Sequence, residues 1–575
     1  MKLLTLKIQN FRCLKGDQNI IDFSKSNILF LIGQNNVGKS TYLRAYEFFV
    51  ASKQNAIKED FYNYDVSTPI IIEGTFLKEE DDDTNTDFTG TGKVADPNWI
   101  NKWVDTTNNQ IRIRKTWNGI GPYAKETFDP VQSQWVANGF GGMDSLFTKY
   151  APTPIFINAM EDENSLEEKV NKLIQDKYLK QLKEQHRISY QDIVDRITQL
   201  QSEILGSDDI RTMNDDLNGQ FHAIFPSLTL KIQSNKEENI KLEDAFKKNH
   251  TITVEKEGVD RKESFLQNGH GIIRQALFNF IAFLQRNHTN DGSKEYLILF
   301  EEPELFLHPK ITLKLRNSLY DLAEHSNYQI LCATHSPMMI DISRPHASLI
   351  RAVKDKDENT ITYQVDEDIF ARDEERKERV QMINRFNPHV CEAFYADNVI
   401  LVEGDTEAIV YRDLLNRFYP DKEIFVLNTG SKNNIPFFLE ILTKFRIKHC
   451  VIHDVDTEFN ADGHHNSAWT LNQRIWELVE QANQAQPGLS RRYVHNANFE
   501  NAHKYHLLGG KEKPLQAYKF AQTIQNREGN IPDCLKWLDD YCGEQQIVHD
   551  MNYIEQVTKT LEQIEQDKLT YQRLE

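Results

Sequence analysis

Long apolar runs are missing from this sequence of 575 residues, whose mean hydropathy is −0.59. No run approaches the roughly 18 to 20 residues that a membrane-spanning helix needs. The opening residues, Met1 to Ile8, alternate polar and apolar side chains like a strand and lack the apolar core and cleavage site of a signal peptide. We therefore expect a soluble, cytoplasmic protein without a membrane partner.

Cysteine is scarce and unpaired in the sequence. The six cysteines are scattered and form no CxxC pair. This spacing excludes a disulfide framework and a zinc site built from paired thiolates. We expect reduced cysteines that mostly serve as buried packing residues.

An excess of positive charge is also absent. The chain has 67 basic and 86 acidic residues, which give a net charge of −19. The molecule as a whole therefore repels nucleic acid, and contact with DNA requires a local basic surface or bound metal cations. The length exceeds the roughly 250 to 300 residues that one core can serve, so we expect several domains.

A phosphate-binding motif stands near the start of the chain. Residues 33 to 40 fit G-x-x-x-x-G-K-[ST] between an apolar run of strand length and a run of helix formers, which is the context of a P-loop. Its backbone N–H groups and lysine can hold phosphates, and its serine hydroxyl can bind Mg²⁺. We predict that ATP is bound by Gly33, Asn36, Gly38, Lys39, Ser40 and Thr41.

Two carboxylates end a later apolar strand, residues 296 to 300. We assign Glu301 to Mg²⁺ and Glu302 to the base that polarises the attacking water, although such a pair taken alone also fits a solvated strand end. His335 follows the next apolar strand, where its imidazole can sense the γ-phosphate by hydrogen bonding. The sequence therefore predicts an ATPase site.

These segments resemble the ABC-type ATPase core shared by SMC, RecF and Rad50 proteins. The resemblance rests on Ile8 to Arg12, the P-loop, Gly269 to Gly271 with Arg274 and Gln275, the Glu-Glu-Pro-Glu run and the Thr-His-Ser-Pro run. It implies that Gly269 and Gly271 contact the nucleotide of a partner subunit, so that ATP binding implies a head-to-head dimer. The chain departs from the family pattern at two places: Glu301 stands where the family usually has Asp, and no Ser precedes Gly269. Both departures argue against rapid ATP hydrolysis more than against ATP binding.

Carboxylates also end two strands of a second α/β pattern. Glu403 follows one apolar strand and Glu407 lies on the next helix, while Asp454 and Asp456 end a later strand. Open α/β sheets bind ligands at such strand ends, and the i, i+2 spacing directs both aspartates to one side. Four converging carboxylates without a basic partner in sequence favour divalent cations, with oxygen ligands preferring Mg²⁺ or Mn²⁺ to zinc.

This second pattern resembles the TOPRIM domain of topoisomerases, primases and OLD-family nucleases. With the ATPase ahead of it, the chain over residues 1 to 365 and 395 to 515 resembles an OLD-family (overcoming lysogenization defect) nuclease, the group that includes the Gabija nuclease subunit and retron-associated nucleases. The resemblance implies an antiphage DNA endonuclease, with Glu500 as a later acid of its site. It also implies a lysine that offsets charge on the cleaved phosphate, and we assign this role to Lys513 in preference to Lys511. The alternative is that these lysines belong to an ordinary charged loop without a role in catalysis.

We predict an α/β fold in which an ABC-type ATPase precedes a TOPRIM domain. The ATPase lobes are residues 1–160 and 221–365, a helical insertion is 161–220, a linker is 366–394, and the TOPRIM domain with a helical extension is 395–575. The amphipathic pattern of the insertion fits a dimerisation arm or a plain helical subdomain, and composition does not decide between them. Expected partners are DNA, a second copy in a homodimer or higher even oligomer, and a defence partner such as a helicase-like subunit or a retron RNA–DNA with reverse transcriptase.

Three classes of function compete for this pattern. A metal-dependent endonuclease controlled by an ATPase dimer is favoured over an SMC- or RecF-like repair ATPase whose TOPRIM domain only binds DNA, because four acids occupy metal-compatible positions. A topoisomerase needs a tyrosine nucleophile in a separate domain, which is not evident, and primases lack this ATPase.

Backbone contacts to DNA are predicted for Lys432, Arg491, Arg492 and Lys519.

Overall fold

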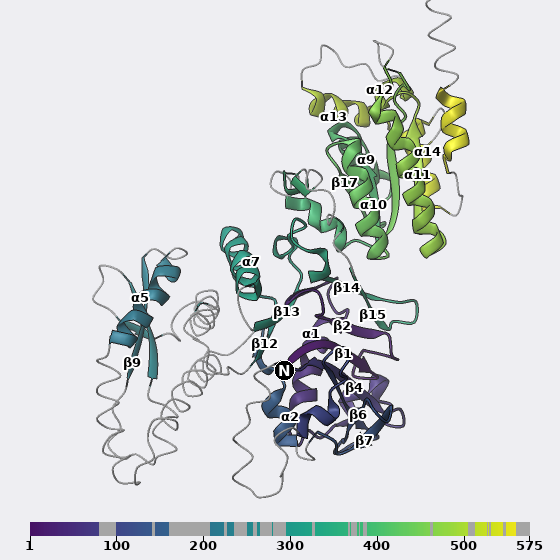
Figure 1. Cartoon of the computed structure of the whole chain (residues 1–575). Helices are drawn as coiled ribbons and strands as arrows, with labels where there is room; N and C mark the ends of the chain where they lie inside the picture. The colour runs from purple at the N-terminus through teal and green to yellow at the C-terminus, as the bar shows by residue number, and fades with distance from the viewer. Residues whose placement is uncertain are drawn as a thin grey trace, which may run out of the picture. The chain divides into compact units, whose positions relative to one another are not determined.

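The computed structural model consists of two compact units (Figure 1). The first contains residues 1–31, 38–339 and 354–361, and the second contains 32–37, 340–353 and 362–575. The structure describes residues 1–79, 99–140, 144–159, 208–222, 227–234, 250–256, 262–264, 279, 295–324, 328–365, 369, 377–378, 380–382, 388–459, 464–503, 512–525, 527, 531–543 and 548–558. Most of the predicted helical insertion, as well as Gly269, Gly271 and Lys511, lies outside these residues.

An antiparallel sheet forms one layer of the first unit, in the strand order β2-β1-β4-β5-β6-β7. Its strands are β1 (Lys2–Gln9), β2 (Asn19–Asp22), β4 (Ile70–Leu77), β5 (Gln110–Trp117), β6 (Ala124–Asp129) and β7 (Gln134–Ala137). Alternate side chains of β4 and β5 are buried, as expected for a sheet that covers a core with one face. On the other face Arg112 pairs with Glu73 at 2.7 Å, and Arg114 pairs with Glu126 at 2.7 Å.

Parallel strands position the predicted nucleotide site of this unit. In spatial order they are β3 (Ile28–Ile32), β13 (Tyr328–Thr334), β12 (Tyr296–Glu301) and β8 (Thr153–Ile157). Every residue of β3 and β13 is buried, which explains their continuous apolar sequence. Because the parallel strands β12 and β13 end at one edge, Glu301 and His335 come together there, and Lys39 and Ser40 at the start of α1 contact them.

Helices, a small sheet and short turns complete the first unit. Helices α1 (Lys39–Val50) and α7 (Pro309–Glu324) follow β3 and β12, and α2 (Asp144–Tyr150) precedes β8. Helix α5 (Asp208–His222) falls within the predicted insertion and contacts a three-stranded sheet, β11-β10-β9, made of β9 (Leu228–Ser234), β10 (His250–Lys256) and β11 (Lys262–Ser264). Single 3₁₀ turns are η1 (Lys58–Asp60), η2 (Tyr62–Tyr64), η5 (Trp99–Trp103) and η7 (Pro337–Met339).

The second unit contains a four-stranded parallel sheet in the order β17-β16-β18-β19. The strands are β16 (Asn398–Val402), β17 (Ile424–Asn428), β18 (Lys448–Asp454) and β19 (Ser490–His495). The helices are α9 (Asp405–Phe418), α10 (Ile435–Lys444), α11 (Ser467–Ala485), α12 (Phe499–Ala502), α13 (Lys513–Thr523) and α14 (Asp533–Cys542), with η8 (His346–Ser348), η9 (Pro388–Phe394) and η10 (Lys432–Asn434). Strands β14 (Leu349–Lys354) and β15 (Thr360–Gln364) are neighbours.

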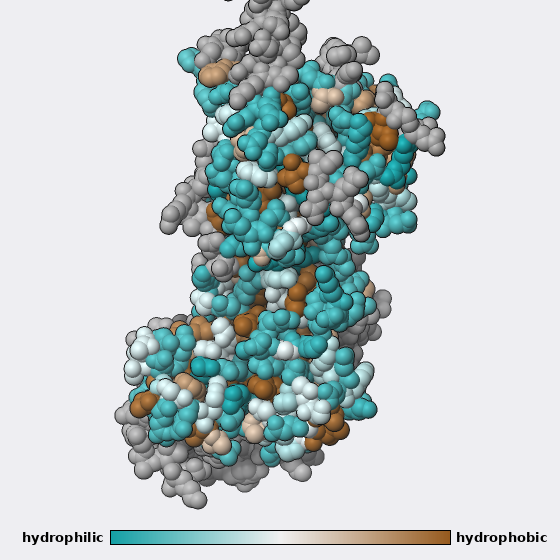
Figure 2. Space-filling view, turned by 90° about the vertical axis from the view of Figure 1, so that its right-hand side faces the viewer, coloured by the Kyte–Doolittle hydropathy of each residue, from teal (hydrophilic) through white to brown (hydrophobic). Residues whose placement is uncertain are grey.

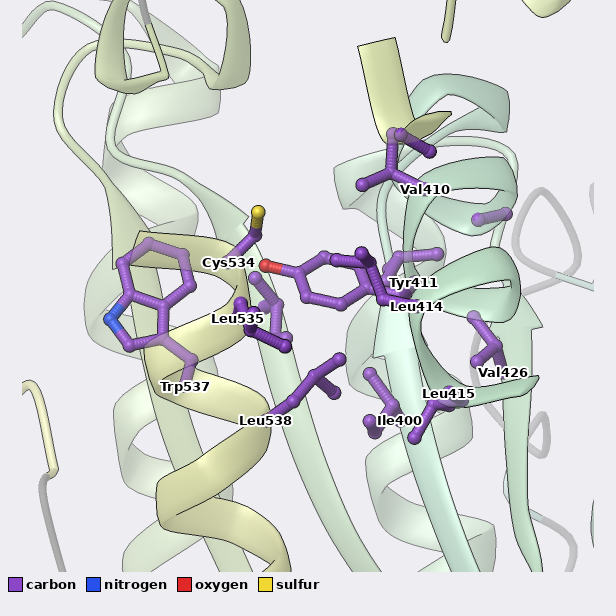
Figure 3. Packing of buried hydrophobic residues seen from close by; sticks show 14 of the residues in the cluster. Ile400, Val410, Tyr411, Leu414, Leu415, Val426, Cys534, Leu535, Trp537 and Leu538 are labelled. Atoms are coloured by element: carbon purple, nitrogen blue, oxygen red, sulfur yellow. The ribbon is translucent and has the colours of Figure 1, made fainter. Parts of the chain in front are cut away.

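The helical C-terminal segment contributes to the core of this second unit. Figure 3 shows the ring of Tyr411 on α9 directed toward Cys534 and Leu535 of α14, with Leu538 beside them. All six cysteines are free and four of them are buried, as expected from their scatter in the sequence. The described helices α13 and α14 are therefore part of the same folding unit as the four-stranded sheet, although their sequences carry no motif.

Arg351 of β14 ties its strand to the segment that leads into β16. Arg351 is 3% exposed, and its guanidinium donates to the backbone carbonyls of Phe394, Ala396 and Phe445. It also pairs with Asp397 at 2.9 Å. A buried guanidinium without such partners would be strongly destabilising, so these bonds make β14 an integral part of the second unit.

Among the helices that the structure describes, none is long and apolar enough to cross a bilayer. On the face drawn in Figure 2, the described residues are largely hydrophilic, and hydrophobic residues occur singly or in small groups. Such scattered apolar residues are normal on a protein surface and do not by themselves mark a binding site.

Candidate active sites: an ATPase centre and a carboxylate centre

The two glycines of the P-loop are required by the space around them. Gly38 has φ +92°, and a Cβ there would lie 2.4 Å from Sγ of Cys13 and 3.0 Å from Oγ1 of Thr360. Gly33 has φ +149°, and a Cβ there would lie 2.3 Å from the carbonyl oxygen of Ala352. The chain therefore accepts only glycine at both positions.

Lys39 contacts His335, another predicted residue of the ATPase site, which in turn contacts Glu302. It is 5% exposed, and its Nζ lies 3.2 Å from Nδ1 of His335, whose Nε2 lies 3.1 Å from Oε1 of Glu302. Burial lowers the pKa of Lys39 to about 8, against the opposing effect of the charges on Glu302 and Glu304. Phosphate oxygens would offer this lysine a charged partner, which binds more strongly than an imidazole.

The two predicted Mg²⁺ ligands of the ATPase site are in contact. The hydroxyl of Ser40 donates to the carboxylate of Glu301, whose second oxygen accepts from the N–H of Ala159 at 3.5 Å. The Ser40 hydroxyl beside the Glu301 carboxylate is an oxygen ligand pair suited to Mg²⁺.

Two other predicted residues of the P-loop region have defined surroundings. Asn36 adopts a left-handed conformation with φ +62°, and Oγ1 of Thr41 lies 3.3 Å from Sγ of Cys13.

Glu304 is a residue of this centre that our sequence analysis did not assign. Its Oε1 accepts hydrogen bonds from Oγ1 of Thr334 at 2.7 Å and from the N–H groups of His335 and Ser336 at 3.0 and 3.1 Å. Burial raises its pKa. Glu304 therefore fixes the loop that carries His335, and the signal in sequence was its place in the Glu-Glu-Pro-Glu run.

Predicted acids of the second site meet at the carboxyl ends of β16 and β18. Glu403 accepts a hydrogen bond from the N–H of Asp454 at 3.4 Å. Glu407 lies in the first turn of α9 and folds back over Gly404, where a Cβ would come within 3.3 Å of its carboxylate. Glu407, Asp454 and His495 each offer one ligand atom within 4.8 Å of the others.

The carboxyl groups of this centre are difficult to ionise together. Burial, followed by the charge of Asp454, raises the pKa of Glu403 to about 7 and that of Glu407 to about 8. Burial, followed by the charges of Asp456 and Glu500, raises the pKa of Asp454 to about 7. Glu500 also raises the pKa of Glu407, so this predicted later acid lies close enough to act on the same centre. A divalent cation would relieve the repulsion, and the donor set fits one.

Lys432 supplies the basic partner that the sequence did not reveal. It is 3% exposed, and its Nζ donates to the carboxylate of Asp456 and to the backbone carbonyl of Asp454, both at 2.6 Å. Asp456 adopts a left-handed conformation with φ +61°, which is unfavourable for an aspartate without such support. The expectation of carboxylates without a basic partner is therefore wrong, because the lysine comes from η10, between β17 and α10.

Three of the four predicted DNA contacts are also wrong, because the side chains are buried. Lys432 is engaged as described, Arg491 is 7% exposed and lies 3.9 Å from Asp540, and Arg492 is 0% exposed and donates to the carbonyl of His549. Only Lys519 is exposed, and its contact with DNA stays a prediction.

If the carboxylate centre cleaves DNA, as the resemblance to OLD-family nucleases implies, Lys432→Met should lower the cleavage rate roughly 10- to 100-fold, because the centre loses a residue that positions a neighbour of its acids. The variant keeps the length of the side chain but leaves Asp456 without its cation, so the turn after β18 loosens. Cleavage rates measured beside Lys422→Met, an exposed lysine of the same unit, provide the check. Equal rates for both variants would show that the ion pair does not position Asp456.

His495 was missed by the sequence analysis. It ends β19 opposite Asp454 in the strand register, is 0% exposed, and places its Nδ1 3.0 Å from Oδ1 of Asp454. Burial lowers its pKa to about 3, so the imidazole is neutral near pH 7. The available signal was its position at the carboxyl end of the strand beside β18.

Lys513 starts α13 and is exposed. Within the described part of the chain, no hydrogen bond or ion pair joins it to the carboxylates of the centre. Its role toward a cleaved phosphate stays a prediction.

Comparisons with known proteins agree with the two centres. A family described as AAA ATPase domain matches residues 1–116 and 106–340, and one described as Overcoming lysogenization defect protein-like, TOPRIM domain, matches residues 394–456. Old nuclease of Escherichia phage P2 is 25% identical over 485 residues, which cover 79% of this chain and 77% of that protein.

Two further relatives share shorter stretches with the chain. OLD nuclease of Thermus scotoductus is 29% identical over 255 residues, 43% of this chain and 47% of that protein. Endonuclease GajA of Bacillus cereus (strain HuB5-5) is 24% identical over 342 residues, 54% of this chain and 47% of that protein. The predicted order of an α/β ATPase followed by a TOPRIM domain is thereby confirmed, and the chain belongs to the AAA ATPase domain family over residues 1–340, with an OLD-like TOPRIM domain after it.

Proposed function

We propose that this protein is an ATP-binding, metal-dependent DNA endonuclease. The observation that carries the proposal is the meeting of Glu403, Glu407 and Asp454 at one sheet edge, where burial and mutual repulsion raise the pKa of all three. The names of the relatives, Old nuclease and endonuclease GajA, support phosphodiester cleavage as the reaction.

The residues of the carboxylate centre have separate tasks in this proposal. A divalent cation, when bound, offsets charge on the scissile phosphate and lowers the pKa of water. Glu407 and Asp454 would hold the cation, and Lys432 keeps the Asp456 carboxylate in place through their ion pair. Glu403, with its pKa raised to about 7, can exchange a proton near neutral pH.

The ATPase centre is proposed to bind Mg²⁺–ATP and to control cleavage. Lys39 and the P-loop N–H groups hold the phosphates, Ser40 and Glu301 hold Mg²⁺, and Glu302 takes a proton from the attacking water. Further parts of the proposal rest on resemblance to the family: a homodimer or higher even oligomer, a role in antiphage defence, a defence partner and a cytoplasmic location.

Plasmid cleavage tests the proposal. We expect the wild-type protein with Mg²⁺ or Mn²⁺ to nick or linearise supercoiled plasmid and Glu403→Ala to leave it intact, because the substitution removes a carboxylate from the centre. Glu423→Ala, which changes an exposed acid of the same unit, should cut like the wild type. A wild-type protein that binds the plasmid without cutting it in either cation would instead favour a repair ATPase that only holds DNA.

A further inference from the structure

The polar edge of the His495 ring faces the carboxylate centre. Its Nδ1 lies 3.0 Å from Oδ1 of Asp454, whereas its Nε2 has no hydrogen-bond partner among the described residues. The rest of the ring packs against aromatic side chains, with Phe499 edge-to-face at 5.0 Å and Trp537 at 5.1 Å. The ring is thus held by packing, with its one described hydrogen-bonding contact directed at Asp454.

Strand pairing fixes this placement. Asp454 and His495 are paired residues at the ends of the parallel strands β18 and β19, and Glu407 reaches the same point from the first turn of α9. Three different elements therefore deliver one ligand atom each to a common point. A site built on strands and a helix is better defined than one built on loops.

The spacing suits a shared cation. Ligand atoms about 2.1 Å from an octahedral ion lie about 3.0 Å from their nearest neighbours. The separation of Nδ1 and Oδ1 is 3.0 Å, and all three ligand atoms lie within 4.8 Å of one another. Asp456 is not in this group, since Lys432 engages its carboxylate at 2.6 Å.

We propose that His495 is a nitrogen ligand of a divalent cation, which it binds together with Glu407 and Asp454. The inference rests on the proposed function and deepens it by naming the metal chemistry of the centre. An imidazole suits transition-metal ions, whereas Mg²⁺ takes oxygen ligands. This position therefore selects Mn²⁺ over Mg²⁺, which a site made only of carboxylates would do less strongly.

Pulsed electron paramagnetic resonance of Mn²⁺ tests the nitrogen ligand directly. Full-length, untagged protein is loaded with one equivalent of Mn²⁺ in the absence of nucleotide and DNA. We expect ¹⁴N modulation in the wild-type spectrum, and its replacement by the ¹⁵N pattern when the protein is made with ¹⁵N-histidine. This measurement requires no substitution, so it does not depend on the folding of a variant.

Variants add an affinity measurement. His495→Gln should abolish the nitrogen modulation and weaken Mn²⁺ binding roughly 10- to 100-fold, with a smaller change for Mg²⁺ measured by competition. His503→Gln is the matched control, because His503 lies in the same aromatic cluster, 5.2 Å from the His495 ring, and is not one of the three ligands. It should keep the modulation.

Two contrary results can be told apart. Mn²⁺ that binds without nitrogen modulation but is lost in Asp454→Asn would overturn the histidine ligand and leave the proposed metal-dependent endonuclease standing. Mn²⁺ binding that does not respond to Asp454→Asn would overturn both.

Discussion

Asp454→Asn should lower DNA cleavage by roughly a thousandfold, because several kcal/mol of charge stabilisation depends on this carboxylate. Asp454 is the common neighbour of the centre: its N–H donates to Glu403, its Oδ1 lies against His495, and its charge raises the pKa of Glu407. Asparagine preserves the shape of the side chain and removes its charge. Cleavage of supercoiled plasmid with Mn²⁺ or Mg²⁺ in excess is the measurement.

The same variant should bind ATP like the wild type, since Lys39 and the carboxylates Glu301 and Glu302 belong to the other unit. Asp421→Asn, an exposed acid of the TOPRIM unit, is the matched control and should cut normally. If cleavage survives when Asp454 and Asp456 are both replaced, the metal assignment is wrong.

Lys39→Ala should lose most of its affinity for ATP, by roughly a hundredfold, because the charge-assisted contacts with the phosphates are removed. Lys39 is 5% exposed at the start of α1, so no other side chain can take its place without rearrangement. Calorimetric titration with ATP and Mg²⁺ measures the change. Lys58→Ala, which alters an exposed lysine of the same unit, should bind normally.

Glu302→Gln separates binding from hydrolysis at this centre. It should keep ATP affinity and hydrolyse ATP at least tenfold more slowly, because an amide cannot accept a proton from water. Phosphate release measured under saturating ATP distinguishes the two effects. Wild-type hydrolysis by both Lys39→Ala and Glu302→Gln would place the ATPase site elsewhere.

The parts of the site that could be predicted are those set by local sequence and strand topology. The P-loop glycines are fixed by backbone conformation, and Glu301, Glu403 and Asp454 follow strands whose carboxyl ends must meet in a parallel sheet. When an apolar run of strand length stops at a carboxylate, the sequence therefore predicts that this carboxylate lies at the carboxyl edge of the sheet. This is why the sequence alone predicted which acids come together at each sheet edge; their roles stay predictions.

The residues that could not be predicted depend on packing between distant segments. Lys432 enters the carboxylate centre from η10, and nothing in its sequence neighbourhood distinguishes it from a surface lysine. Arg491 and Arg492 look like DNA-binding residues, yet every residue of β19 is buried and both guanidinium groups find partners inside the unit. The sequence shows how many basic residues the chain has, but only the folded structure shows which of their side chains are exposed to solvent and available to DNA.

The guanidinium of Arg351 bears on how the two halves of this architecture could be exchanged in evolution. A TOPRIM sequence transferred from residue 395 onward would leave β14 behind, and with it the donor to the carbonyls of Ala396 and Phe445 and the counter-charge of Asp397. The transferable module is therefore longer than its catalytic motifs indicate. A recombination point just before residue 340 would keep the arginine together with the carbonyls and the carboxylate that it binds, and it would also transfer residues 354–361, which belong to the first unit.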